Sequence, residues 1–353
     1  MPSEYGKSRP SRRKSTDRRT APETAGESVL VKLVDGTGYV KIRNLRSALR
    51  GGHATILRGT LSGAQVALKL PHLLSTVQRE LLRRELKSWR RVRHPHVLPL
   101  LGIYDDGLQL GLMTMWLVNG HLLRYIREND KANVNRLIRE VAEGLNYLHI
   151  GARIVHGDLK CENVLISESG HAQLADFGLS TVIDKEPDDR TTATKIREQS
   201  SLAFSAPELL VDAVYDIRTV TSDDSSTTSS VRRKRSKTVE TDVYAYGMLI
   251  LQAFTGQPPW HAAQNVMQLC MQVLKGARPP HPGPAAQQRG LAGIVWTICN
   301  QCWESKPQLR PRMPDIILMF TTSKPVVRER AQLASRTPSI RGKRSTTAGR
   351  VRR

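Results

Sequence analysis

The sequence predicts an α+β fold in which strands dominate before residue 116 and helices dominate after it. Three apolar runs near the start have the length of strands and occupy 65–70, 97–102 and 110–116. Apolar residues recur at helical spacing, or fill a long apolar run, at 76–93, 121–126, 134–148 and 242–254. Only the first of these helices falls among the strands, so the two kinds of element are largely segregated along the chain.

The composition is that of a globular chain with basic appendages. The chain has 353 residues, 39% of them hydrophobic, and a formal net charge of +22. Residues 1–28, 217–238 and 321–353 carry +3, +4 and +9, which leaves +6 for the rest. These segments have few large apolar side chains, so we expect a disordered N-terminal tail, a disordered insertion and a disordered C-terminal tail. We interpret them as solvated arms; nucleic-acid binding through the tails is the alternative, but no aromatic residues are interleaved with the charges.

The cysteines do not form a disulfide framework in a chain of this length. Cys299 and Cys302 make a C-x-x-C, which suggests a redox or metal site. They also stand at helical spacing beside the apolar Val295 and Ile298, with no second cysteine pair nearby. We therefore interpret them as buried thiols.

The sequence predicts a cytoplasmic location. No apolar core of a signal peptide is seen near the N-terminus, and no apolar run reaches the roughly 18 residues of a membrane span. We expect a chain without membrane contact in a reducing compartment. The basic run 232–235 would also serve as a nuclear import signal, so the nucleus is a second expected location.

A lysine and a glutamate occupy positions where a charge is unexpected. Lys69 stands among apolar residues near the end of the strand-like run, and Glu85 lies within an apolar stripe of Val77, Leu81, Trp89 and Val92. A carboxylate facing inward is costly unless it is paired, so we expect the two side chains to pair. The alternative is two solvated surface charges.

A polar loop between two short apolar runs carries the strongest chemical signal. Asp158, Lys160 and Asn163 stand at offsets 0, +2 and +5. They are preceded by a strand-like pair of apolar residues at 154–155 and followed by a strand-like run of three at 164–166. Eighteen residues after Asp158 comes Asp176-Phe177-Gly178, reached through the apolar run 173–175. A polar loop held between strands is where a rigid scaffold presents catalytic groups.

These two motifs, in this order and at this separation, resemble the catalytic loop and the metal-binding motif of protein kinases. Ala206-Pro207-Glu208 resembles the end of a kinase activation segment, and the likeness spans about 49–319. The resemblance implies a two-lobed kinase domain at 40–320, with a small β-rich N-lobe to about 116 and a larger helical C-lobe over 117–320. It also implies ATP and Mg²⁺ as cofactors and a protein substrate with a serine or threonine hydroxyl; the oligomeric state is not predicted.

The resemblance assigns a role to each polar residue. Asp158 would accept the proton of the attacking hydroxyl, and Lys160 would offset charge on the γ-phosphate. Asn163 and Asp176 would hold Mg²⁺, for which oxygen ligands are suited. Lys69 would hold the α/β-phosphates while Glu85 orients it.

Further residues follow from the same likeness. The adenine would lie between Ile56, Ala67 and Leu165, beside Thr114 and the backbone from Met115 to Leu117. For the apolar residues among these, membership of the ordinary core is also expected. Ser201 would tie the activation segment to Asp158 and Lys160, Asp242 would hold the catalytic-loop backbone, and Glu208 would pair with Arg310.

Several residues suggest a subclass. Lysine two positions after the catalytic aspartate is typical of serine/threonine kinases. His94-Pro95, Pro99-Leu100-Leu101-Gly102, Trp116 and Cys302-Trp303 resemble the tyrosine-kinase-like group, and within it the fungal members.

The sequence departs from the kinase pattern in two places, the phosphate-binding loop and residue 157. The phosphate-binding loop should contain three glycines, but Leu49, Gly51 and Ala54 occupy those positions, with Gly52 as an extra. This departure raises the alternative of a pseudokinase that binds nucleotide as a scaffold, because side chains crowd the backbone's approach to phosphate. Gly157 replaces an arginine that usually pairs with a phosphate on the activation segment. We therefore hypothesise that activity does not depend on such a phosphate.

Overall fold

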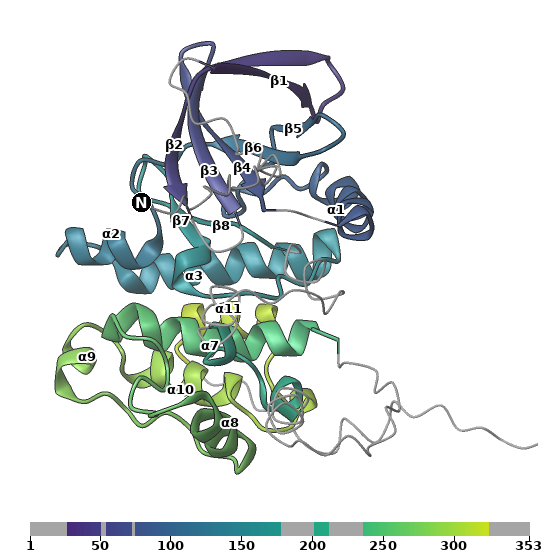
Figure 1. The fold of residues 1–353 in the computed structure, drawn as a ribbon. Coiled ribbons are helices and arrows are strands. Elements are labelled where there is room, and N and C mark those ends of the chain that lie inside the picture. Colours follow the sequence, from purple (N-terminus) through teal and green to yellow (C-terminus); the bar gives the residue numbers. More distant parts are fainter. Residues whose placement is uncertain (1–26, 51–53, 73–74, 178–200, 212–235, 325–353) are drawn as a thin grey trace, which may run out of the picture.

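A computed structural model of the chain describes five segments: 27–50, 54–72, 75–177, 201–211 and 236–324 (Figure 1). Several predicted features fall outside these segments. They are Gly51, Gly52, the threonines of the activation segment, most of the insertion and most of both tails. The described residues form a strand-rich N-terminal part and a helical C-terminal part, as the patterning predicts.

Six antiparallel strands close into a barrel in the N-terminal part. They are β1 (Glu27–Leu33), β2 (Tyr39–Arg50), β3 (Ala54–Leu61), β4 (Ala64–Pro71), β5 (Gly102–Asp105) and β6 (Leu110–Met115), in the order β1-β2-β3-β4-β6-β5. Side chains alternate between the two faces of each strand, so Leu57, Val66, Leu68 and Met113 fill the barrel interior. Their immediate neighbours in sequence face outward, and among these are the residues predicted to bind nucleotide.

The barrel begins earlier than the sequence analysis predicts. Strand pairing begins ahead of the predicted domain start at 40, because β1 pairs with β2 on one side and with β5 on the other. For the same reason residues 27 and 28 belong to a strand rather than to a tail. The missed signal is the run Asp35-Gly36-Thr37-Gly38 between two alternating segments, a strong hairpin pattern. Gly36 has a φ of +83° and Asp35 accepts two hydrogen bonds from Thr37, as expected of a tight turn.

The predicted helix and strands of this part need three adjustments. Helix α1 (Thr76–Trp89) ends before the predicted Arg93, and its described buried residues are Leu82, Leu86 and Trp89. Trp89 and Val92 are buried as predicted, and Leu82 and Leu86 were not part of the predicted stripe. The side chains of Val77, Leu81 and Glu85 lie outside the described ones. The predicted strand at 97–102 is mostly loop, and β5 begins only at Gly102. Residues 97–101 are held instead by loop hydrogen bonds, such as Leu98 N–H to Leu174 O.

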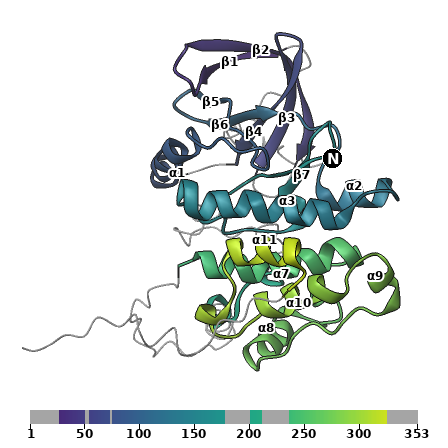
Figure 2. The same ribbon diagram turned by 180° about the vertical axis from the view of Figure 1, so that it is seen from behind.

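The C-terminal part consists mainly of helices packed around a central one (Figures 1 and 2). Its labelled helices are α2 (Leu122–Glu128), α3 (Val134–Asn146), α7 (Val239–Thr255), α8 (Val266–Leu274), α9 (Pro284–Gln288), α10 (Gly293–Cys302) and α11 (Met313–Thr322). Every residue of α7 from 241 to 254 is buried. Each fully buried leucine or isoleucine contributes roughly 1.5–3 kcal/mol, so this helix is the main hydrophobic support of the part.

Both ends of α7 are set by the sequence. Thr238, which the sequence analysis placed in the insertion, is the N-cap, and Gly256 at a φ of +73° ends the helix. At the other end of the chain, α11 extends to Thr322, slightly into the predicted C-terminal tail.

A long helix and a short sheet join the two parts. In α3 the apolar residues Leu137, Ile138, Val141 and Leu145 are fully buried, and the helix continues into one π-helical turn over Tyr147–Ala152. Strands β7 (Val164–Ile166) and β8 (Ala172–Leu174) form a two-stranded antiparallel sheet. The predicted strand at 154–155 is absent from the described residues, because this extended pair has no neighbouring strand. The polar loop at 156–163 thus lies between the π-helical turn and β7.

All four cysteines are buried as free thiols: Cys161, Cys270, Cys299 and Cys302. Burial raises the pKa of each thiol above its usual range. In the described part of the chain no group of three or more His, Cys, Asp or Glu side chains could hold a metal. The C-x-x-C is therefore part of the helical core, as predicted. Among the described residues, no helix has the length and apolar character needed to cross a membrane.

We predict that the thiols of the native chain are protected. Because both burial and the raised pKa suppress the reactive thiolate, fewer than about one thiol per chain should react with Ellman's reagent at pH 8 within minutes. All four should react after unfolding in guanidinium. Rapid titration of two native thiols would instead support an accessible C-x-x-C.

Candidate active site

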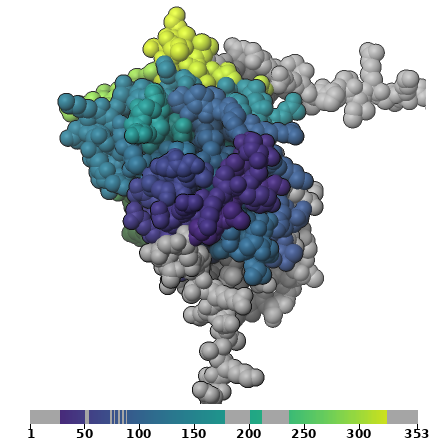
Figure 3. Space-filling model, turned by 90° about the horizontal axis from the view of Figure 1, so that it is seen from above, coloured from purple at the N-terminus to yellow at the C-terminus, as the bar shows by residue number. Residues whose placement is uncertain are grey.

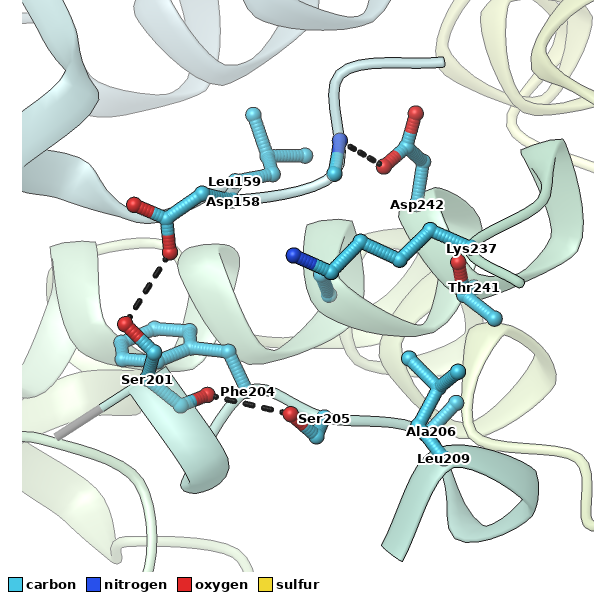
Figure 4. A pocket seen from close by; sticks show the side chains of 12 residues that line it. Asp158, Leu159, Ser201, Phe204, Ser205, Ala206, Leu209, Lys237, Thr241 and Asp242 are labelled. Carbon is cyan, nitrogen blue, oxygen red and sulfur yellow. Dashed lines mark hydrogen bonds between the residues drawn. The ribbon is translucent and has the colours of Figure 1, made fainter. Parts of the chain in front are cut away.

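The polar loop folds so that Lys160 and Asn163 meet Asp158, and Ser201 of a later segment joins them; Figure 4 shows the contact between Asp158 and Ser201. Lys160 Nζ lies 3.0 Å from Asp158 Oδ2, and Ser201 Oγ donates to Asp158 Oδ1 at 3.1 Å. Lys160 Nζ also donates to Ser201 Oγ at 3.0 Å. The three side chains, from two segments 41 residues apart, form a closed triangle in which the sequence-predicted contacts of Ser201 are present.

Asp158 is kept ionised by its neighbours. Burial opposes the charge, but the Lys160 ammonium and the hydrogen bonds from Lys160 and Asn163 outweigh it and hold the pKa of the carboxyl below its usual range. Asn163 Nδ2 donates to both the backbone oxygen and the Oδ2 of Asp158, at 2.6 and 2.9 Å. At neutral pH the aspartate is therefore a fixed hydrogen-bond acceptor.

Asp242 holds the backbone of the loop from below. Its Oδ2 accepts from the N–H of His156 at 2.7 Å and its Oδ1 from the N–H of Gly157 at 2.8 Å. His149 Nε2 lies 2.9 Å from Oδ2, and Asp242 itself is 1% exposed. A buried carboxylate with three donors is well satisfied, so it fixes the start of the catalytic loop on α7. Gly157 takes a φ of +77°, a conformation in which an L side chain is strained.

A second polar residue of α7 was not predicted. Gln252 is 1% exposed; its Oε1 accepts from the N–H of Cys161 at 3.0 Å and its Nε2 donates to Glu162 at 2.9 Å. It therefore anchors the middle of the loop as Asp242 anchors its start. The available signal was a lone amide within an otherwise apolar buried helix, since such a group needs partners.

Lys69 and Asp176 meet at the junction of the two parts. Lys69 Nζ, on β4, lies 2.6 Å from Asp176 Oδ1, with both side chains partly exposed. Glu85, the predicted partner of Lys69, lies on α1, but its side chain is not among those described. Asp176 has a φ of +61°, which aspartate tolerates better than most residues and which is common at functional sites.

Asn163 lies next to Asp176 through the backbone. The N–H of Ala175 donates to the backbone oxygen of Asn163 at 2.9 Å, so the residue before Asp176 is tied to Asn163. Because the side-chain nitrogen of Asn163 is engaged by Asp158, its side-chain oxygen is the atom left to act as a ligand. The two predicted metal ligands therefore offer oxygen atoms from adjacent positions.

The predicted adenine-binding residues lie on the outward face of the barrel strands. Ile56 is in register with Lys69, and Ala67 with Thr114, so these residues share one face of β3, β4 and β6. Leu165 lies on β7, which is tied to the chain after β6 by a hydrogen bond from Ile166 N–H to Gly120 O.

Met115, the last residue of β6, is 38% exposed, and Leu117, just after the strand, is half-buried. The structure thus brings the barrel residues together with Lys69, whereas Gly51 and Gly52 lie outside the described residues.

A further contact, not predicted from sequence, joins α1 to the segment after Asp176. The rings of Trp89 and Phe177 have centroids 4.6 Å apart, and both side chains are buried. Phe177 also faces the ring of His156 at 6.3 Å. Such aromatic pairs add about 0.5–1.5 kcal/mol beyond burial, so α1, Phe177 and the catalytic loop are packed as one unit.

Arg310 and Glu208 form the ion pair that the sequence analysis predicts. Two nitrogens of Arg310 donate to the two oxygens of Glu208 at 2.7 and 2.8 Å. Arg310 also donates to the backbone oxygens of Glu240 and Glu304, and its side chain is fully buried. This bidentate pair fixes the end of the segment that carries Ser201.

A pocket opens beside Asp158, between the catalytic loop, the segment 201–209 and the start of α7 (Figure 4). Ser201, Phe204 and Ala206 form one wall and Asp242 lies at the loop side. The side chain of Lys237 extends into the space (Figure 4). The pocket has an acceptor, a cation and an apolar wall within reach of one another.

Together, the barrel lysine, the two aspartates and the anchored loop define the class of phosphoryl-transfer sites. The sequence profile of the family described as protein kinase domain matches residues 50–319. The chain belongs to this family.

Individual relatives cover the same region. A probable serine/threonine-protein kinase of Dictyostelium discoideum is 27% identical over 274 residues, which is 76% of this chain and 26% of that protein. A receptor-interacting serine/threonine-protein kinase 2 of Bos taurus is 26% identical over 291 residues, 77% of this chain and 49% of that protein. A serine/threonine-protein kinase of Arabidopsis thaliana is 24% identical, over 76% of this chain and 42% of that protein. The chain therefore matches between about a quarter and a half of the length of these relatives.

We predict that Arg310→Ala destabilises the fold by about 3–5 kcal/mol, because it leaves Glu208 without its buried partner. Urea unfolding followed by far-UV circular dichroism measures the change. Arg312→Ala is the matched control: this side chain is exposed, and its loss should change stability by less than about 0.5 kcal/mol. Equal stabilities of the two variants would contradict the structural importance of the pair.

Proposed function

We propose that the chain is an active protein kinase that transfers the γ-phosphoryl group of ATP to serine or threonine hydroxyls of protein substrates. The single observation that carries this proposal is the arrangement around Asp158. An ionised carboxylate is paired with Lys160 and Ser201 and anchored by Asp242, and it lies beside a pocket. A phosphoryl-transfer site needs positioning and charge neutralisation more than covalent chemistry, and these residues supply both.

Each residue has a definite task in this reaction. Asp158 accepts a hydrogen bond from the substrate hydroxyl and takes its proton as the bond to phosphorus forms. Lys160 offsets negative charge on the transferred phosphoryl group, and Ser201 fixes the geometry of both. Lys69 binds the α/β-phosphates, while the outward face of Ile56, Ala67 and Thr114, together with Leu165 and the backbone at 115–117, takes the adenine.

The residues present fit a magnesium ion. Asn163 and Asp176 offer hard oxygen atoms from adjacent positions, as Mg²⁺ requires, and we assign them as its protein ligands. When bound, the ion neutralises charge on the β- and γ-phosphates. Glu85 would orient Lys69 from α1.

The substrate class follows from two features. Lysine two residues after Asp158 is typical of serine/threonine kinases, and the relatives carry that name. The pocket beside Asp158 gives a protein chain room to present its hydroxyl. The proposal extends to the tyrosine-kinase-like group and its fungal members, which the motifs around Pro95, Trp116 and Trp303 resemble.

A pseudokinase that binds nucleotide as a scaffold is the second candidate. The observation that favours it is the loop before β3, where Leu49 and Ala54 replace two of three glycines. Leu49 is 58% exposed and Ala54 is buried, so neither offers the bare backbone that glycine gives to a phosphate. Nevertheless Lys69, Asn163 and Asp176 are all present.

We predict transfer of the γ-phosphate from MgATP to a generic basic protein by the purified full chain. Asp158→Asn removes the proton acceptor and should lower kcat by ~10²–10⁴-fold. Lys69→Met should also abolish most of the activity. Asp130→Asn, an exposed carboxylate ahead of α3, is the matched control and should leave the rate unchanged.

The two candidate functions differ in the outcome of this assay. Equal signal from wild type, Asp158→Asn and Lys69→Met would show that the activity is a contaminant and would refute the enzyme. Magnesium-dependent ATP binding without any transfer would establish the pseudokinase.

We also predict that activity does not require a phosphate on the activation segment. Gly157 provides no cation at the position where many kinases have arginine. Replacing Thr191, Thr192 and Thr194 together by alanine should therefore change kcat/KM by less than about threefold, or ~0.6 kcal/mol. Complete loss of activity in a variant that keeps its native melting temperature would contradict the hypothesis.

A further inference from the structure

The N-terminal hairpin contacts helix α1, although it precedes the family match at residue 50. Its strand β1 pairs with β5 through Lys32 opposite Ile103 and Leu33 opposite Gly102. A Cβ added to Gly102 would lie 2.5 Å from Val31 Cγ1, so the glycine leaves room for β1. Seen from above, β1 and β2 form part of the outer surface of the barrel (Figure 3). The hairpin is thus an integral wall of the domain.

Val34, the residue after β1, connects this wall to α1. Its N–H donates to Leu101 O at 3.1 Å, and its side chain packs in the cluster that contains Leu86 and Trp89 of α1. Its backbone oxygen accepts two hydrogen bonds from the guanidinium of Arg90, at 2.9 and 3.2 Å. Arg90 directly follows α1, and its own N–H bonds to Leu86 O, so the contact is made at the helix C-terminus.

Two other arginines hold α1 to the same side of the barrel. Arg79 donates to the backbone oxygens of Gly107 and Leu108, in the turn after β5. Arg83 makes two hydrogen bonds to Asp105 at the end of β5. Arg79 and Arg83 bind residues at the end of β5 or just after it, and Arg90 binds the residue after β1. Because β1 pairs with β5, all three arginines attach α1 to neighbouring strands of the barrel (Figures 1 and 2).

The far side of α1 reaches the candidate active site. Trp89 is buried against Phe177, whose preceding residue, Asp176, pairs with Lys69 at 2.6 Å. A rotation of α1 about its long axis would displace Trp89 and remove the packing that fixes Phe177. Asp176 is the residue that the proposed function assigns to magnesium, so the orientation of α1 bears directly on the reaction.

We propose that β1, Val34 and Arg90 form a clamp that positions α1 for catalysis, so that residues 27–38 are a working part of the kinase domain. This proposal rests on the proposed function. Arg90 is a positioning residue: its two charge-assisted hydrogen bonds fix the C-terminal end of α1, where a cation also complements the helix dipole. The clamp acts through Trp89 and Phe177, without touching nucleotide.

The experiment compares Arg90→Ala with Arg91→Ala in the full chain. Arg91 is adjacent and exposed, and within the described residues it makes no hydrogen bond or ion pair. Arg90→Ala should lower kcat by about tenfold, equivalent to ~1.4 kcal/mol, with an unchanged melting profile. In Arg90→Lys a single ammonium group can make one hydrogen bond to the backbone oxygen of Val34 in place of two, so this variant should recover part of the rate lost in Arg90→Ala. Arg91→Ala should match wild type.

Hydrogen exchange provides a readout that does not depend on activity. In Arg90→Ala the amides of α1 and those at 176–177 should exchange faster than in wild type, whereas Arg91→Ala should leave them unchanged.

The outcomes separate the two proposals. An inactive wild type would refute the proposed kinase activity. The hydrogen-exchange comparison of Arg90→Ala with Arg91→Ala would then be the test of whether the clamp exists. Equal kcat and equal exchange for Arg90→Ala and Arg91→Ala would overturn the clamp while leaving the kinase intact. A loss of kcat in Arg90→Ala that accompanies general unfolding would also overturn it, since Arg90 would then be merely structural.

Discussion

The carboxylate of Asp242 is the interaction on which the rest of the site depends. It lies in α7, whose residues from 241 to 254 are all buried, and an unpaired charge there would cost several kcal/mol. Its oxygens are satisfied by the backbone of His156 and Gly157 and by His149. His156 and Gly157 donate through backbone N–H groups that belong to the catalytic loop. The hydrogen bonds that stabilise the charge of Asp242 therefore also fix the position of the loop.

Charge balance then explains the arrangement above α7. Asp158 and Asp176 each have a lysine within 3.0 Å, from the loop itself and from the barrel respectively. The Lys69–Asp176 ion pair also joins the two parts of the molecule. The same residues therefore neutralise one another before nucleotide arrives and are positioned to bind phosphate and metal when it does.

The sequence was informative where chemistry is local. Asp158, Lys160 and Asn163 are close in the chain, so their spacing alone nearly dictates that they meet. The pair Glu208–Arg310 joins residues 102 apart, and only the family resemblance could predict it.

Arg90 was missed because its partner is a backbone oxygen of a distant segment, which leaves no trace in residue patterns. For Gln252 the sequence showed only that a lone amide in an apolar helix needs partners, and it did not indicate that these are Cys161 and Glu162. The hairpin at 27–38 was different, since its Asp-Gly-Thr-Gly turn is visible in the sequence and was simply given too little weight. Leu82 and Leu86 were not part of the predicted stripe of α1, because apolar residues also occupy adjacent positions of that helix.

Closure of the barrel by β1 affects how one molecule of the protein can associate with another. A strand at the edge of a sheet exposes a row of unpaired N–H and C=O groups that can recruit a strand from another molecule. With β1 between β2 and β5, the described barrel presents a continuous ring of paired strands. The hairpin thus protects the molecule from edge-to-edge aggregation, and solubility at high concentration depends on a segment that a family-based domain boundary would discard.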